Sequence, residues 1–379
     1  MDVQLRVDRQ LVDSFRATSP GCATVAAMTS DVEHPTESRA ARSRRLNPAT
    51  VVLWREPDVV QLELSHKRIV IRNVLPEHLL ALLPVRSRAG SLGSARVPAG
   101  YAELTDRLSK AGFLARRPAP GQFPAYLFPE FGCLLDRHGD RATDVLRRRR
   151  QAAVAVHGTS RVAVAVAGAL ASAGIGHIQL VGEGDVAAAD CMPGGLLPTD
   201  EGSRFAVAAT AAVQRNSPGV AVGPLGNRKA DLVLLTDPVP IEPTLRDALH
   251  LDRVAHLAAS VHGSRAVVGP LVLPGRTSCL RCADLHRTER DQRWPVLAMQ
   301  LSARVRRRPP ADTALGVAAV GLAAGQALQF LDGHQPETVE GTMEWHLPDW
   351  RLRRRTWRPH ADCDCGAAAE PGRDGRMGL

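Results

Sequence analysis

The chain is 379 residues long, with a formal net charge of +9, 44% hydrophobic residues and only 4% aromatic residues. This length allows two domains with apolar cores, and the basic excess suits an acidic peptide, protein or nucleic acid, or arginines dispersed over the surface. Few aromatic residues disfavour base stacking. We find no apolar run near the ~20 residues of a membrane span and no signal-peptide core. Seven cysteines then indicate a reducing cytoplasm.

The N-terminal part of the chain changes from a polar tail to alternating segments. Residues 1–45 are rich in Ser, Thr, Pro and Arg without periodicity, and we predict a disordered tail. Residues 49–74 alternate, and Val60, Leu62 and Leu64 share one side of their run. With Ser-His between two alternating runs, this pattern predicts a β-hairpin.

Two helices are predicted after the hairpin. The first covers 75–85 and opens with a proline, and the second is an amphipathic helix over 99–116 that stops near Gly112. Strands combined with short helices predict a small α+β domain of winged-helix type. With a basic connector at 145–150, this domain occupies residues 46–150.

A second domain is predicted over residues 151–366, followed by a short tail at 367–379. Its first apolar strand, 152–158, is followed by an Ala-rich helix and a second apolar strand, 175–182. This β-α-β order with continuously apolar strands predicts a parallel sheet that is covered on both faces. The further predicted elements are helices at 200–218, 244–260 and 312–333, and strands at 219–222, 230–237, 265–275 and 338–360.

The turn after the first apolar strand resembles a nucleotide-binding turn with two of its three glycines replaced. A Gly-x-Gly-x-x-Gly turn needs glycine for tight turning, phosphate approach and helix packing. Here Gly158 is followed by Ser160 and Ala163, and Gly182 stands where an acid would bind a ribose. The turn either still binds nucleotide or keeps a Rossmann-like geometry for packing, and the side chain of Ser160 favours packing.

Cysteines occur as two close pairs about 80 residues apart, which is typical of a metal site. The four residues are Cys279, Cys282, Cys363 and Cys365. Four thiolates satisfy a tetrahedral structural zinc ion, which would pin the chain end to the loop after the sheet. His286 and His360 are spare candidate ligands. Ordinary reduced cysteines and a redox or persulfide role are the alternatives.

Longer segments resemble a known family. The β-α-β segment 154–186, the strand 230–237 and the cysteine pairs resemble the ThiF/MoeB type of the ubiquitin-activating-enzyme fold. Segments 269–295 and 347–365 are similar to an actinobacterial branch described as TOMM-precursor leader-peptide-binding, or cyclodehydratase-like, ThiF protein. The resemblance covers about residues 49–366 and implies a Rossmann-like α/β domain with a mixed sheet. The Cys-x-Cys spacing of the second pair is tighter than that family's usual Cys-x-x-Cys.

The resemblance also implies a reduced ATP site. Active members adenylate the C-terminal carboxylate of a small protein, using cationic groups on the phosphates and a metal-binding acid. Asp237 matches the family's acid, whereas Phe205 stands near the place of the family's lysine. Arg161, Arg204 or Lys229 could substitute for the lost cations. Asp237 and Arg161 are therefore the candidate catalytic residues beside a degenerate pocket.

The function that the resemblance implies is peptide binding. The N-terminal domain of this chain resembles the peptide clasp of ribosomal-peptide maturation systems. In that clasp a leader peptide adds as a strand to a hairpin and docks against a helix. The corresponding segments here would be the hairpin at 49–74 and the helix at 101–112. Such a scaffold delivers the precursor to a YcaO-type cyclodehydratase that forms azolines in bacteriocin biosynthesis. A working adenylyltransferase is the alternative, a nicotinamide-dependent dehydrogenase is disfavoured by the Ser160 substitution, and a homodimer is expected.

Two basic features have several interpretations. Residues 284–295 are expected to form a loop that faces a partner or the active site, or a salt-bridged surface turn. Arginine runs are interpreted as solvated or interdomain surfaces, as an acidic-peptide site, or least favourably as a nucleic-acid site. These runs lie at 147–150, 304–308 and 351–355.

Overall fold

The protein is described here by a computed structural model. The residues it describes are 44–65, 67–72, 102–116, 121–237, 240–303 and 310–367. The expected helix at 75–85, the arginine run at 304–308 and almost all of both expected tails lie outside them. The chain divides into two compact units. The first contains residues up to Thr143 except Pro124–Leu127, and the second contains Pro124–Leu127 and the chain from Asp144 onward.

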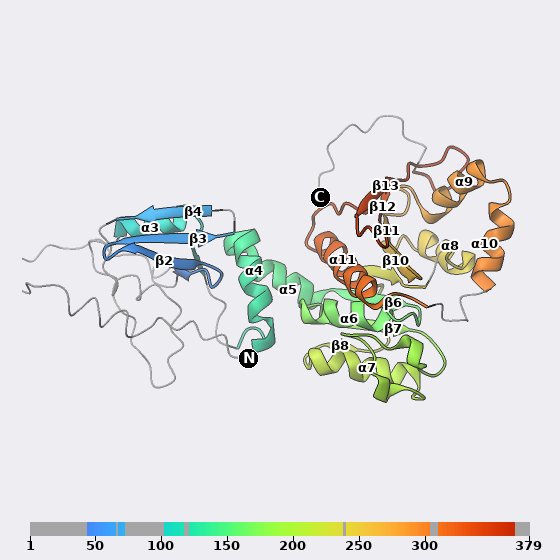
Figure 1. The fold of residues 1–379 in the computed structure, drawn as a ribbon, viewed down its shortest axis with the longest axis horizontal. Coiled ribbons are helices and arrows are strands. Elements are labelled where there is room, and N and C mark those ends of the chain that lie inside the picture. The colour runs from blue at the N-terminus through green and yellow to red at the C-terminus, as the bar shows by residue number, and fades with distance from the viewer. Residues whose placement is uncertain are drawn as a thin grey trace, which may run out of the picture. The chain divides into compact units, whose positions relative to one another are not determined.

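The first unit is an α+β domain (Figure 1). Its regular elements are β1 (Arg44–Leu46), β2 (Val51–Glu56), β3 (Val59–Leu64), β4 (Lys67–Ile71), α3 (Ala102–Lys110), β5 (Leu114–Arg116) and α4 (Phe128–His138). Strands β2, β3 and β4 form an antiparallel meander, and β1 pairs with β5. The predicted hairpin is therefore confirmed, and its β3–β4 turn lies at the Ser-His step.

Alternation along β3 forms the core of this unit. Val60, Leu62 and Leu64 are fully buried and pack with Leu108 of α3 and with Phe113. The helix ends at Lys110, close to the predicted stop at Gly112, because Gly112 takes a positive φ of 78° and the chain then enters β5. A left-handed backbone ends a helix most easily at glycine.

The second unit is built on an eight-stranded mixed sheet with the order β13-β12-β11-β10-β9-β6-β7-β8. Strands β8, β7, β6, β9 and β10 are parallel, and β11, β12 and β13 are antiparallel. The strands are β6 (Ala153–His157), β7 (His177–Val181), β8 (Ala221–Val222), β9 (Leu232–Leu235), β10 (His256–His262), β11 (Arg265–Val272), β12 (Gly341–His346) and β13 (Arg353–Thr356). The predicted Rossmann-like mixed-sheet architecture is confirmed.

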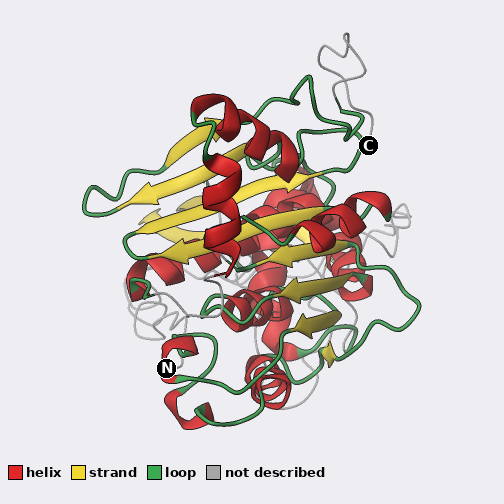
Figure 2. Cartoon of the chain, turned by 90° about the vertical axis from the view of Figure 1, so that its right-hand side faces the viewer, coloured by secondary structure: helices red, strands yellow, loops and turns green. Residues whose placement is uncertain are grey.

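Helices cover both faces of this sheet (Figure 2). The helices from residue 142 onward are α5 (Ala142–Gln151), α6 (Ala163–Ser172), α7 (Phe205–Asn216), α8 (Pro243–Leu251), α9 (Leu280–Arg290), α10 (Trp294–Ala303) and α11 (Thr313–Leu331). Alternate residues of one strand face opposite sides. Val154 and Val156 therefore join the core beneath α6, α7 and α11, whereas Ala155 joins a second core with Leu249 of α8 and with the cysteine pairs.

Helix α11 is the one helix in the described part of the chain that is long and apolar enough to cross a membrane. It packs against α6, β10 and β11, and Leu315, Ala319, Ala323 and Ala327 are buried. In this structure it is thus a core helix of the second unit, where the sequence predicts a helix over 312–333.

Three expected elements differ from the structure. The helix expected over 244–260 ends with α8, because Arg253 takes a left-handed conformation and the chain enters β10 between β9 and β11. Alanine-rich sequence there is a strand because burial at the centre of the sheet overrides helix propensity. The loop expected at 284–295 is mostly helix α9. The expected connector at 145–150 lies within helix α5.

Candidate functional site

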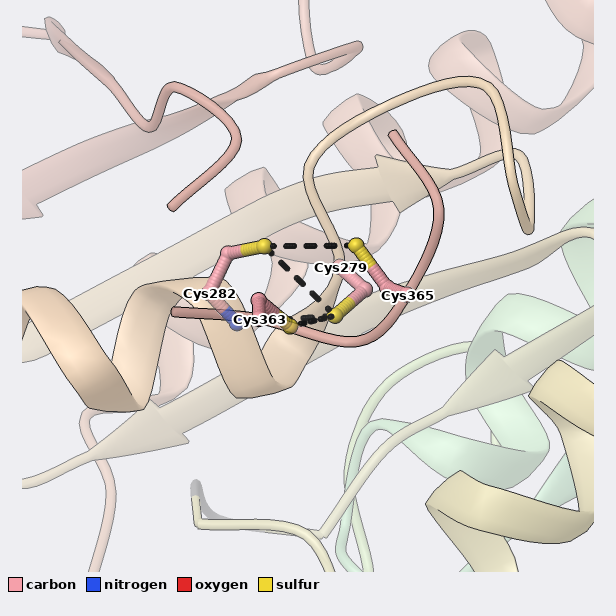
Figure 3. A group of neighbouring side chains, drawn as sticks. All are labelled: Cys279, Cys282, Cys363 and Cys365. Atoms are coloured by element: carbon pink, nitrogen blue, oxygen red, sulfur yellow. Dashed lines mark hydrogen bonds between the residues drawn. The ribbon is translucent and has the colours of Figure 1, made fainter. Parts of the chain in front are cut away.

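The four cysteines lie together on one face of the sheet, as Figure 3 shows. Cys279 is the N-cap of α9, and its Sγ accepts a hydrogen bond from the backbone N–H of Cys282 at 3.4 Å. Cys282 lies in the first turn of the same helix. Cys363 and Cys365 belong to the segment after β13. The helix start and the chain end thus each contribute two sulfurs to one cluster.

The spacing of the sulfurs fits one tetrahedral ion. The Sγ–Sγ distances are 3.7 Å for Cys279–Cys282 and 3.6 Å for both Cys279–Cys363 and Cys282–Cys365. With zinc–sulfur bonds of about 2.3 Å, sulfurs at the corners of a tetrahedron are about 3.8 Å apart. All four residues are buried, with exposed fractions of 0–7%. Four inward-facing thiols can hold a metal ion and leave it no open position.

Other contacts fix the terminal segment at this cluster. The backbone N–H of Cys363 donates to the carbonyl of His360 at 3.1 Å, and Arg281 forms an ion pair with Asp364 at 2.6 Å. Burial raises the pKa of the Cys363 thiol to about 12, whereas the hydrogen bond from Cys279 lowers the pKa of Cys282. The thiols therefore interact as one group rather than as independent cysteines.

The nucleotide-like turn joins the ends of β6 and β9. Gly158 has φ of +120°, and a Cβ there would lie 2.5 Å from Oδ1 of Asp237. Only glycine fits this close approach. Oδ1 of Asp237 accepts the backbone N–H of Thr159 at 3.2 Å. Burial raises the pKa of Asp237, and the backbone hydrogen bonds from Thr159 and Ser160 oppose that shift.

The replaced positions of the turn have structural contacts. The hydroxyl of Ser160 donates to the carbonyl of Thr236 at 2.7 Å, and Ala163 is fully buried at the start of α6. A Cβ on Gly182 would lie 2.7 Å from Cε1 of Phe205, so this aromatic ring packs against the end of β7. Phe205 is itself only 2% exposed. The replaced positions of the turn therefore contact neighbouring parts of the fold: Ser160 contacts the end of β9, and Gly182 lies against Phe205.

The predicted substitute cations have other partners. Arg161 donates to the carbonyl oxygens of Ala311 at 2.6 Å and Cys191 at 2.9 Å. Arg204 pairs with Asp185 at 3.4 Å, and the amine of Lys229 lies 3.7 Å from a carboxylate oxygen of Asp252. The guanidinium of Arg161 thus joins three loops of the fold. Asp237 therefore lies at the turn, whereas the guanidinium of Arg161 is hydrogen-bonded to the carbonyl oxygens of Ala311 and Cys191.

Sequence reasoning missed two clusters of charged residues. Arg149 and Asp332 form a buried two-point ion pair, with distances of 2.8 and 2.6 Å, and both side chains are at most 3% exposed. Glu289 lies between His286 and His360, so these histidines form their own group rather than ligands of the cysteine cluster. The i,i+3 spacing of His286 and Glu289 was a usable signal, but only once that segment is recognised as a helix.

These features define a Rossmann-like α/β domain in which four buried thiols, from the start of α9 and from the segment after β13, lie together. The family model described as "ThiF family" matches residues 136–367, which is more than half of the chain. The chain therefore belongs to the ThiF family, as its resemblance implied.

Solved structures share this fold at low sequence identity. Escherichia coli MccB with MccA-N7isoAsn has a TM-score of 0.60 and 14% identity, and the match covers 86% of this chain and 99% of MccB. MccB with ATP has a TM-score of 0.60 and 16% identity, covering 85% and 99%. PaaA has a TM-score of 0.52 and 16% identity, covering 67% and 91%. No curated protein sequence matches the chain.

Proposed function

We propose that this chain is a peptide-binding scaffold of the ThiF family. It holds the leader of a ribosomally made precursor peptide and presents that precursor to a YcaO-type cyclodehydratase for azoline formation in the cytoplasm. Similar folds support a peptide partner, because MccB has been solved with its peptide MccA. A homodimer is part of this proposal.

One observation supports a scaffold in particular: the cation nearest the nucleotide-like turn is used inside the fold. Arg161 binds two carbonyl oxygens and the hydroxyl of Thr313, and the ring of Phe205 packs at Gly182. Phosphoryl transfer depends on preorganised positive charge at the phosphates. Because the Arg161 guanidinium is hydrogen-bonded to carbonyl oxygens of the fold, little of that positive charge is available at the turn.

The peptide surface is proposed on the first unit. Strand β4 pairs only with β3 among the described residues, and we propose its other edge as the place where a strand is added. Its start, Lys67, lies beside Gly112 at the end of α3. Arg68 and Val70 are exposed on β4. An extended peptide can pair with such an edge by main-chain hydrogen bonds, and its acidic residues would meet the basic side chains.

The test compares peptide binding with nucleotide chemistry. A fluorescein-labelled precursor peptide, taken from a short Cys/Ser/Thr-rich reading frame beside this chain's gene, should bind in an anisotropy titration. Val70→Glu should weaken binding at least tenfold, while Val207→Glu, at an exposed position on α7 of the second unit, should not. ATP–pyrophosphate exchange should stay at background. Equal binding by both variants would remove the β4 edge from the proposal.

The alternative is an active adenylyltransferase for a C-terminal carboxylate. Two retained features favour it, Gly158 at the turn and the buried carboxyl group of Asp237, and MccB of similar fold has been solved with ATP. Exchange of labelled pyrophosphate into ATP that disappears in Asp237→Asn would establish this function in place of a passive scaffold.

A further inference from the structure

Three arginines from two separate segments of the second unit gather at one tryptophan ring. Arg287 and Arg290 lie one turn apart on α9, and Arg355 lies on β13 at the edge of the sheet. Their guanidinium carbons lie 4.9, 5.6 and 5.7 Å from the centroid of the Trp357 ring. Both segments are basic in the sequence, and the fold brings them to one place.

The tryptophan ring holds this arginine cluster in position. Trp357 is 2% exposed, and its Nε1 donates to the hydroxyl of Thr342 at 3.1 Å. An aromatic ring attracts a guanidinium group within about 6 Å of its centre, and this attraction offsets part of the repulsion between neighbouring cations. The N–H donors of a guanidinium group lie in its own plane, so a group over a ring can still bind other acceptors. The ring therefore keeps three sets of donors close together.

Acidic partners neutralise only part of the charge of this cluster. Arg287 pairs with Asp284 at 2.9 Å. Arg355 lies 3.6 Å from Glu344, a nearly buried carboxylate that also pairs with Arg265 at 3.0 Å. The side chains of Arg265 and Arg355 are about half exposed. One carboxylate thus faces two guanidinium groups that solvent can reach.

Arg290 is the third arginine of the cluster, and it has no acidic partner in the described part of the chain. Its side chain is exposed, and its guanidinium lies over the Trp357 ring. Glu289, its neighbour in the sequence, contacts His286 and His360 instead. The cluster therefore has an excess of positive charge at an exposed position, which suits a negatively charged ligand.

We propose that Arg287, Arg290 and Arg355 form a binding surface for an acidic peptide segment. Planar guanidinium groups bind carboxylates through two parallel hydrogen bonds, and several separate guanidinium groups suit a chain with several carboxylates. A nucleic acid fits less well, because the Trp357 ring is buried and cannot stack on bases. This surface lies on the second unit, and its test is independent of the peptide proposed for β4 of the first unit.

A labelled acidic peptide tests this surface. Fluorescein-labelled hexaglutamate should bind the full chain in an anisotropy titration at low salt, and hexaglutamine should not. Arg290→Gln and Arg355→Gln should each weaken hexaglutamate binding at least about tenfold, because each removes a charged pair of donors. Arg253→Gln, at an exposed arginine after α8, removes the same charge and is the matched control, so it should bind as wild type.

Thermal unfolding of each variant shows whether it is folded. If Arg355→Gln is destabilised through its contact with Glu344, the exposed Arg290→Gln variant decides. Absence of hexaglutamate binding overturns the proposal, as does equal affinity of Arg290→Gln and Arg253→Gln. Displacement of the peptide by millimolar phosphate at constant ionic strength would overturn it in favour of a small anion. Tighter binding of single-stranded DNA that Arg290→Gln abolishes would overturn it in favour of nucleic acid.

Discussion

Removing one ligand from the four-cysteine cluster should release the chain end from the sheet. The cluster joins Cys279 to Cys363, 84 positions later. A cross-link that closes a loop of this length restricts the unfolded chain by about 4–5 kcal/mol in the loop-entropy description. A bound metal acts as that cross-link, because its ligands come from both ends of the loop. Cys365→Ser keeps the size of the side chain and removes a sulfur ligand.

The expected result is a large fall in thermal stability. For a domain of more than 200 residues, each kcal/mol shifts Tm by about 2–4 °C, so the variant should unfold about 10–15 °C below wild type. Scanning calorimetry measures this shift, and elemental analysis should find one zinc per chain in wild-type protein held with a weak chelator. Cys133→Ser, at an exposed thiol of the first unit, is the control and should unfold with wild type.

Two results would refute this reasoning. If protein purified without a chelator contains no zinc, then no zinc ion cross-links the two cysteine pairs. A Cys365→Ser variant that unfolds within about 2 °C of Cys133→Ser would show that the cluster does not restrain the chain end. In that case the four thiols would be reduced cysteines that pack in the second core.

Three further predictions concern the second unit, each measured by urea unfolding. Asp332→Ala should lower the free energy of unfolding by about 3–5 kcal/mol, because it removes the carboxylate that faces the buried Arg149 guanidinium. Asp144→Ala, in an exposed pair on α5, should lower it by less than about 1 kcal/mol. Burial lowers the pKa of His256 from 6.5 to about 4 in the folded protein. As the pH falls, the unfolded chain therefore takes up a proton at a higher pH than the folded protein does. The free energy of unfolding should fall by about 3 kcal/mol between pH 6.5 and pH 4. His256→Gln should remove that part of the pH dependence. Arg161→Lys should lower the free energy of unfolding by about 2–3 kcal/mol, because an amine cannot replace the forked contacts, and unchanged stability would contradict their role.

Sequence patterns predicted the fold well where the periodicity of apolar residues along one segment determines its secondary structure. The apolar strands around residues 154 and 178, the alternation of Val60, Leu62 and Leu64, and the glycine-ended helix α11 all lie where expected. Each depends on periodicity and burial that neighbouring residues share. The two cysteine pairs predicted that four thiols lie together, and the structure groups them.

Tertiary contacts decided the elements that the sequence did not predict correctly. Strand β10 has an alanine-rich sequence with a helical pattern, and it is a strand because β9 and β11 pair with it on both sides. Arg161 looked like a free cation, because no local pattern shows that Ala311, 150 residues away, would accept its hydrogen bond. Glu289 was not recognised beside His360 for the same reason. Long-range partners are not visible in a single sequence.

The retained residues of the nucleotide-like turn do not by themselves indicate catalysis. Gly158 is required by its backbone conformation and by the closeness of Asp237, and Asp237 accepts the backbone N–H of Thr159 at the turn. Both would be needed in a protein that only uses this turn to connect β6 to α6 beside the end of β9. The positions that would contact phosphate are not fixed by the backbone in this way. At these positions the chain has Ser160, which donates to the carbonyl of Thr236, and Arg161, which donates to the carbonyl of Ala311. These substitutions are the reason that we propose a binding role, rather than catalysis, for this member of the ThiF family.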